Sequence, residues 1–101
     1  MAATIRWTLP AADDFEAIFE YLVRDAPLYA KRFSEDLLST VESLRLHPAR
    51  GWRVPELQDE NYREVLVDSY RLMYRELGDV IEVAAIIHVS RDFASAWKKR
   101  E

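Results

Sequence analysis

Three short runs of residues that read as strands constrain the fold more than any other feature of this chain. They occupy residues 62–67, 70–75 and 80–89, and the two-residue turns expected between them are Asp68-Ser69 and Gly78-Asp79. Side chains alternate between the two faces of a strand. The pattern therefore predicts three consecutive antiparallel strands. One face can close a core, while the other presents guanidinium groups suited to an anion, a nucleic acid or an acidic partner.

The middle run shows this alternation most clearly. The face expected to be buried carries Tyr70, Leu72 and Tyr74. The opposite face carries Arg71, Met73 and Arg75. Solvent-facing arginines on a strand either serve a partner or pair with nearby carboxylates, so both interpretations are open. Glu64 and Glu82 are the expected partners for such pairs.

Two helices are predicted before these strands, after a short edge strand at residues 4–7 that joins the sheet. Pro10 fits the first turn of a helix, and Pro27 ends that helix or opens the next. The short link implies an antiparallel helical hairpin. The spacing predicts that the hairpin buries Phe15, Ile18, Phe19, Leu22, Val23, Ala30, Phe33, Leu37, Val41 and Leu44.

The rest of the chain is predicted as one loop and one tail. Residues 48–59 are irregular, and residues 94–101 are expected to form a short helix that lays Trp97 on the core. The predicted order is β-α-α-β-β-β over a single domain, residues 1–101. This is an α+β fold in which the helical hairpin packs on one face of an antiparallel sheet.

Composition excludes several classes of function. The chain has no cysteine and only two histidines, so we expect no disulfide framework, no metal site and no cofactor. The net charge of −4 argues against a general nucleic-acid binder. The N-terminus lacks the pattern of a signal peptide, and no apolar run approaches the roughly 20 residues that span a bilayer. We therefore expect a cytoplasmic protein without a membrane partner.

Several short motifs, in this order and at this spacing, together resemble the RelE/ParE superfamily of bacterial type II toxins. The similarity extends over nearly the whole chain. It rests on Trp7-Thr8, Ala12, Asp13, Phe15, Ile18, Tyr21, Leu44, Pro48, Gly51 to Leu57, Tyr62-Arg63-Glu64, Tyr70 to Arg75 and His88 to Asp92. The resemblance implies a compact toxin fold and a cognate antitoxin, ParD-like or RelB-like, that neutralises it.

The superfamily divides into two activities. RelE-like members cleave mRNA on the ribosome without a metal, and ParE-like members poison DNA gyrase. The resemblance places Arg71 and Arg91 where the nucleases keep functional arginines, and Arg63 where they keep a lysine. Val65 and Trp97 depart from that pattern, because neither side chain can replace a lysine or a proton-transferring tyrosine. The interpretation favoured is therefore a ParE-like toxin, with a ribonuclease and a detoxified antitoxin-binding protein as alternatives.

The candidate site residues follow from these alternatives. If the chain is a ribonuclease, the catalytic candidates are Arg71, Arg91 and His88, the last as the proton carrier. The candidates for contact with a target are Arg63, Arg71, Arg75, Arg91, Trp52, Lys98, Lys99 and Arg100. The structural alternatives stay open: an Arg91–Asp92 salt bridge, a structural His88, and a Trp52 that plugs the edge of the core instead of anchoring a partner.

Overall fold

The computed structural model describes residues 2–59 and 61–98. Its elements are β1 Thr4–Trp7, α1 Leu9–Asp25, α2 Pro27–Ser43, β2 Trp52–Arg53, β3 Tyr62–Val67, β4 Tyr70–Leu77, β5 Val80–His88 and α3 Phe93–Lys98. The predicted succession of strands and helices is confirmed. The short strand β2 is an addition, and it lies within the segment predicted as a loop.

The strands form one five-stranded sheet in the order β1-β5-β4-β3-β2. Neighbours from β2 to β5 are antiparallel, as predicted, but β1 runs parallel to β5, with Thr4 opposite Val80 and Trp7 opposite Val83. The sheet is therefore mixed and not wholly antiparallel. Tight turns fix the directions of β3, β4 and β5, whereas β1 is connected through two helices, so no local turn sets its direction.

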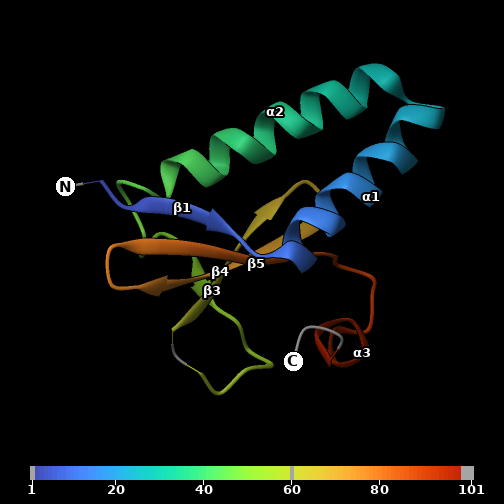
Figure 1. Cartoon of the computed structure of the whole chain (residues 1–101). Coiled ribbons are helices and arrows are strands. Elements are labelled where there is room, and N and C mark those ends of the chain that lie inside the picture. Colours follow the sequence, from blue (N-terminus) through green and yellow to red (C-terminus); the bar gives the residue numbers. More distant parts are fainter. Residues whose placement is uncertain (1, 60, 99–101) are drawn as a thin grey trace.

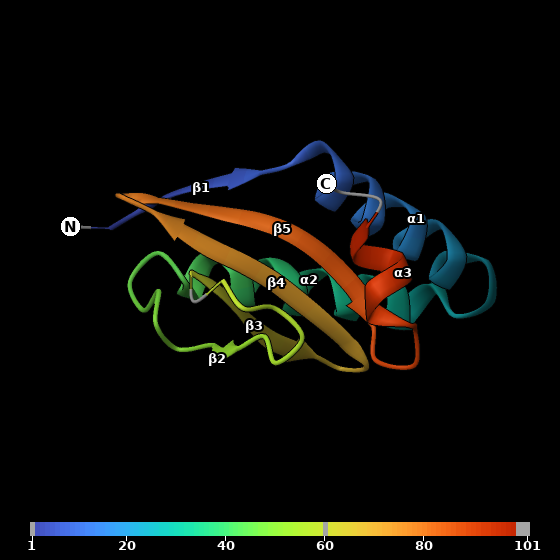
Figure 2. The same ribbon diagram turned by 90° about the horizontal axis from the view of Figure 1, so that it is seen from below.

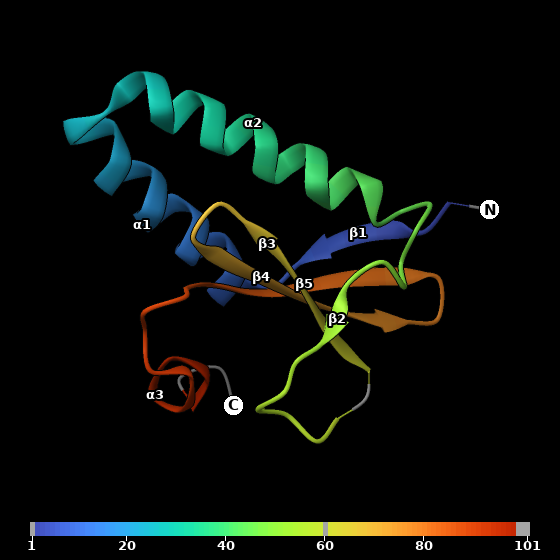
Figure 3. The ribbon, with the colours of Figure 1, turned by 180° about the vertical axis from the view of Figure 1, so that it is seen from behind.

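Different elements cover the two faces of the sheet. The hairpin of α1 and α2 lies on one face, which we call the hairpin face (Figure 1). The loop after β2 and helix α3 lie on the other, which we call the far face (Figures 2 and 3). The core of the hairpin face includes Phe33, Leu37, Val41, Leu44, Leu72, Tyr74, Ile81 and Val83. The far face has a smaller core of Val54, Met73, Ala85, Ile87, Phe93 and Ala96.

The two long helices bury their apolar stripes to different extents. The predicted stripe of α2 is buried in full. Along α1, in contrast, Phe15, Ile18 and Leu22 are only partly buried, and Phe19 and Val23 are 37% and 41% exposed. The prediction that these last two are buried was wrong. The turn between the helices projects beyond the sheet, so this end of α1 has little to pack against (Figure 1).

Local sequence signals account for the ends of these elements. The Thr8 hydroxyl caps α1 by accepting a hydrogen bond from the Ala11 amide at 3.1 Å. Ala26 alone links the two helices, and Pro27 opens α2. The hairpin turns place Asp68 and Gly78 at φ values of 53° and 62°, the left-handed region that Gly and Asp tolerate better than most residues.

A buried tyrosine fixes the loop that carries β2. The Tyr74 hydroxyl donates to the Pro48 carbonyl at 2.6 Å and accepts from the Gly51 amide at 3.0 Å. A Cβ at position 51 would lie 2.7 Å from that hydroxyl oxygen, so only glycine fits there. These contacts hold the neighbouring Trp52 and the loop that follows it against the sheet.

Candidate functional site

Arg71 lies at the centre of an ion-pair cluster on the far face. Its Nη1 and Nη2 donate to the two carboxylate oxygens of Glu56 at 2.9 and 2.6 Å, and its Nε donates to Glu64. The guanidinium also lies over the Phe93 ring, 5.0 Å from the ring centroid. The carboxylates of Glu56 and Glu64 therefore pair with Arg71, the arginine that the sequence suggested for anion binding.

The cluster is only partly open to solvent. The Arg71 and Glu64 side chains are 13% and 15% exposed, and Glu56 is 39% exposed. Hydrogen bonds from Arg71 lower the pKa of the Glu56 carboxyl below its ordinary value. Hydrogen bonds to Glu56 and then to Glu64 raise the pKa of Arg71. An incoming phosphate would have to displace a charge-assisted, bidentate contact from this arginine.

Arg75 is paired in a similar way further along β4. Its Nε donates to Glu82 at 2.9 Å, and the second oxygen of Glu82 accepts from Arg6 at 3.1 Å. The Arg75 guanidinium lies 5.2 Å from the centroid of the Tyr62 ring. The pairing alternatives considered for the two β4 arginines, with Glu64 and with Glu82, are both present in the structure.

The sheet separates His88 from Arg71. Tyr70 lies opposite His88 and Arg71 lies opposite Ile87, so alternation puts His88 on the hairpin face. The His88 ring meets the Tyr70 ring edge-on at 5.0 Å, and its Nδ1 accepts from the Ser90 amide at 3.0 Å. The structure therefore does not bring together the two residues on which RNA cleavage was expected to depend jointly.

The other candidate arginines are also distributed over different surfaces. Arg63 lies opposite Tyr74, on the hairpin face, and its Nη1 donates to the Gly51 carbonyl at 3.0 Å. Arg91 follows β5 and is exposed, and its amide donates to the His88 carbonyl at 3.0 Å. Arg63 thus supports the loop that holds β2, while the Arg91 side chain is open to a partner.

The C-terminal candidates are only partly described. Asp92 caps α3, because its Oδ2 accepts from the Ser95 amide at 3.2 Å and from the Ser95 hydroxyl at 2.6 Å. The Asp-x-x-Ser spacing could have suggested this role from the sequence. Lys98 ends α3 and is exposed, while Lys99 and Arg100 lie outside the described residues.

Trp52 lies in β2, opposite Glu64, and is 80% exposed. It does not plug the core, so the structure excludes that alternative.

Glu56 is the site residue that the sequence did not suggest. It lies in an irregular loop, where no periodicity predicts which side chain reaches the sheet.

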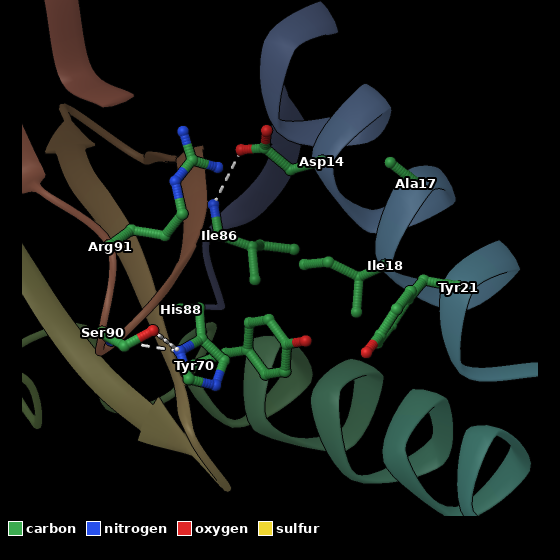
Figure 4. Close-up of a pocket in the computed structure, with 9 residues that line it drawn as sticks. All are labelled: Asp14, Ala17, Ile18, Tyr21, Tyr70, Ile86, His88, Ser90 and Arg91. Atoms are coloured by element: carbon green, nitrogen blue, oxygen red, sulfur yellow. Dashed lines mark hydrogen bonds between the residues drawn. The ribbon is translucent and has the colours of Figure 1, made fainter. Parts of the chain in front are cut away.

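A hollow of about 510 Å³ opens between α1 and the sheet (Figure 4). Ala17, Ile18 and Tyr21 line it from α1, and Tyr70 and His88 line it from the sheet. At one end the Asp14 carboxylate accepts a hydrogen bond from the Ile86 amide at 2.9 Å. We call this space the α1 hollow.

Within residues 2–59 and 61–98, no group of histidine and carboxylate side chains is arranged to hold a metal ion. No helix in the same residues is long and apolar enough to cross a membrane.

Comparison with known proteins identifies the family. The model of the family described as "ParE toxin of type II toxin-antitoxin system, parDE" matches residues 5–93. The chain belongs to this family. It is also 31% identical to Toxin RelE2 of Caulobacter vibrioides over 90 residues, which are 88% of this chain and 98% of that protein. The chain is thus a type II toxin of the ParE/RelE superfamily, and the predicted resemblance is confirmed.

Two solved structures share the fold. A chain of the chromosomal ParDE toxin-antitoxin system from P. aeruginosa superposes with a TM-score of 0.71 at 22% identity, over 86% of this chain and 96% of that one. A chain of the RelBE2 toxin-antitoxin complex from Mycobacterium tuberculosis superposes with a TM-score of 0.59 at 19% identity, over 87% and 99%. The predicted α+β toxin fold is confirmed.

Proposed function

We propose that this toxin is ParE-like: it inhibits DNA gyrase and is neutralised by a cognate antitoxin. The main support for this proposal is the position of Arg71. Glu56 and Glu64 pair with it on the far face, whereas His88 lies on the hairpin face. Metal-free RNA cleavage needs positive charge and a proton carrier at one phosphate. The separation of these groups supports action by protein contact, and so does the ParE family match.

The two residues that depart from the nuclease pattern, Val65 and Trp97, also argue against RNA cleavage. The Val65 side chain is buried in the core of the hairpin face. Trp97 stacks on Phe93 and meets Tyr62 edge-on, so its indole serves the packing of α3. Neither position supplies a charge or a titratable proton near Arg71.

The α1 hollow is the surface best suited to an antitoxin. Ala17, Ile18 and Tyr70 give it apolar walls, and Tyr21 in its lining is 61% exposed. Exposed apolar surface of this kind marks a protein interface. An antitoxin segment that folds on binding could lay an apolar helix face into it. Both solved neighbours come from toxin-antitoxin systems, which supports such a partner.

A RelE-like ribonuclease is the second candidate function, because the relative from Caulobacter vibrioides carries the name RelE2. In this alternative an RNA phosphate would displace Glu56 from Arg71. His88 could not act at that phosphate from the opposite face of the sheet. The alternative therefore requires a proton carrier other than the one expected from the sequence.

A gyrase assay tests the proposal. The wild-type protein should inhibit supercoiling and accumulate the gyrase cleavage complex. Arg91→Ala should weaken inhibition, whereas His88→Gln should leave it unchanged. Absence of inhibition by folded wild-type protein would contradict the gyrase assignment.

Expression in the native host tests the antitoxin separately. Without the neighbouring gene the toxin should arrest growth, and with it growth should resume. A soluble, harmless protein that binds no product of that gene would overturn this part of the proposal.

A further inference from the structure

A second hollow, of about 460 Å³, lies on the far face beside the Arg71 cluster. We call it the Trp52 hollow, and it is lined by Trp52, Arg53, Pro55, Glu56, Glu64, Leu66, Arg71 and Val89. Trp52, Leu66 and Val89 are large apolar side chains that are all exposed. An exposed tryptophan beside a partly buried arginine is the composition typical of interface hot spots.

The protein already places a carboxylate in this hollow. Glu56 extends from a loop anchored by the buried Val54, and its two oxygens accept from Arg71. The neighbouring Pro55 is exposed and contributes to the same lining. The segment shows which chemistry the hollow accepts, namely a carboxylate next to apolar groups.

The two carboxylates on Arg71 differ in how easily they can leave. Glu64 projects from the middle of β3 and is 15% exposed, whereas Glu56 lies in a loop and is 39% exposed. Displacement of Glu56 by another carboxylate breaks one bidentate pair with Arg71 and forms an equivalent one, so the net cost is small. Glu64 would remain and keep the arginine oriented.

We propose that the Trp52 hollow docks a short segment of the toxin's protein target, in which one carboxylate is flanked by apolar residues. Glu56 is then an internal competitor that occupies Arg71 until the segment arrives. This inference rests on the proposed function, since it takes the target to be a protein. Arg71 would bind the incoming carboxylate, while Trp52, Leu66 and Val89 would contact its apolar neighbours.

The charges favour an acidic peptide over a nucleic acid. Glu64 keeps its pair with Arg71 after Glu56 leaves, so the vacated position has room for one carboxylate in place of another and not for a chain of phosphates. Nucleic-acid binding draws most of its affinity from many cations along the backbone. Of the two arginines that line this hollow, Arg71 is paired with carboxylates and has apolar side chains around it, which is a poor match for that requirement.

Peptide binding tests the chemistry of the hollow. The probe is a fluorescein-labelled peptide with one glutamate flanked by leucines, and its glutamine counterpart is the reference. Glu56→Gln should tighten binding of the glutamate peptide about fivefold, as expected when a competing ion pair of ~1 kcal/mol is removed. Trp52→Ala should weaken it about tenfold or more. The glutamine peptide should bind weakly to every variant.

Two matched variants control for general effects. Glu42→Gln removes a carboxylate that pairs with Arg45 at 2.6 Å near the end of α2. Leu46→Ala removes an apolar side chain that is 70% exposed and does not line the hollow. Both should bind the peptide like the wild type. Equal binding of the two peptides, no gain in Glu56→Gln, or tighter binding of a single-stranded oligonucleotide by Glu56→Gln would each overturn the proposal.

A gyrase titration with the same variants separates this inference from the proposed function. Trp52→Ala should lose gyrase inhibition by about tenfold or more, as for a hot-spot residue, while Leu46→Ala keeps it. If the wild type inhibits gyrase and Trp52→Ala inhibits it equally well, the docking site is wrong and the proposed function stands. If the wild type does not inhibit gyrase, the proposed function fails, and the peptide measurements alone decide whether the hollow binds a carboxylate.

Discussion

Different interactions hold the covering elements on the two faces of the sheet: apolar packing on the hairpin face, and a smaller apolar core with ion pairs on the far face. On the hairpin face, Phe33, Leu37 and Leu72 are fully buried among apolar side chains from both helices. On the far face, a smaller apolar core lies beside ion pairs centred on Arg71 and Arg75. The area buried on the hairpin face stabilises the fold, whereas the charged contacts add little net stability.

The difference separates contacts that stabilise the fold from contacts that a partner protein could replace. Apolar packing on the hairpin face cannot open without unfolding the core. The Arg71–Glu56 pair joins a loop to the sheet, and in the docking proposed above a carboxylate of the target protein replaces Glu56. This contrast is the reason for placing contact with the target on the far face.

The largest expected effect comes from comparing two leucines on opposite faces. Leu72→Ala on the hairpin face should lower the free energy of unfolding by roughly 2–5 kcal/mol, because it removes fully buried apolar area and leaves a cavity. Leu66→Ala on the neighbouring strand, 66% exposed, should change it by about 0.5 kcal/mol or less. Urea denaturation measures both. Similar losses in the two variants would mean that the far face is packed more tightly than described.

A smaller loss is expected when the far-face cluster is broken. Arg71→Ala leaves Glu64 with no guanidinium partner in a largely buried position, which should cost about 2–3 kcal/mol, below the range for fully buried pairs because the cluster is partly solvated. Arg6→Ala is the matched control. Glu82 keeps Arg75 in that variant, so the loss should be about 1 kcal/mol or less. An Arg71→Ala protein as stable as the wild type would show that Arg71 contributes no net stability to the folded protein.

The fold was largely predictable because its signals are local. Alternation fixed the faces of β4, and helical spacing identified the buried stripe of α2. The direction of β1 and the exposure of Phe19 could not be predicted in this way. Both depend on where the hairpin sits over the sheet, which is a relation between distant parts of the chain.

The candidate site was less predictable than the fold. The sequence indicated that Arg71 could pair with a carboxylate, because Glu64 lies on an adjacent strand. It gave no sign of Glu56, whose loop reaches Arg71 from 15 positions away. Nor did it show that His88 and Arg71 lie on opposite faces, since that requires the pairing register of β4 and β5.

The smallest expected effect concerns pH. Arg71 holds the pKa of Glu56 below the ordinary 4.5 of a glutamate. A lowered pKa in the folded protein adds stability that is present above the unfolded-state pKa and is lost as the pH falls through the folded-state pKa. The stability difference between the wild type and Glu56→Gln should therefore shrink as the pH falls below about 4.5. Denaturation at pH 7 and at a series of lower pH values measures it, and a difference that grows towards acid would contradict the pairing.

The most direct test of the central claim is mRNA cleavage on programmed ribosomes, followed by primer extension. Arg71 is paired with Glu56 and Glu64, and the sheet separates it from His88, so we expect that it does not serve RNA cleavage. The wild-type protein is therefore predicted to give no codon-position cleavage under conditions in which it inhibits gyrase. Robust cleavage by the wild type that disappears in Arg71→Ala would show that Arg71 serves RNA cleavage.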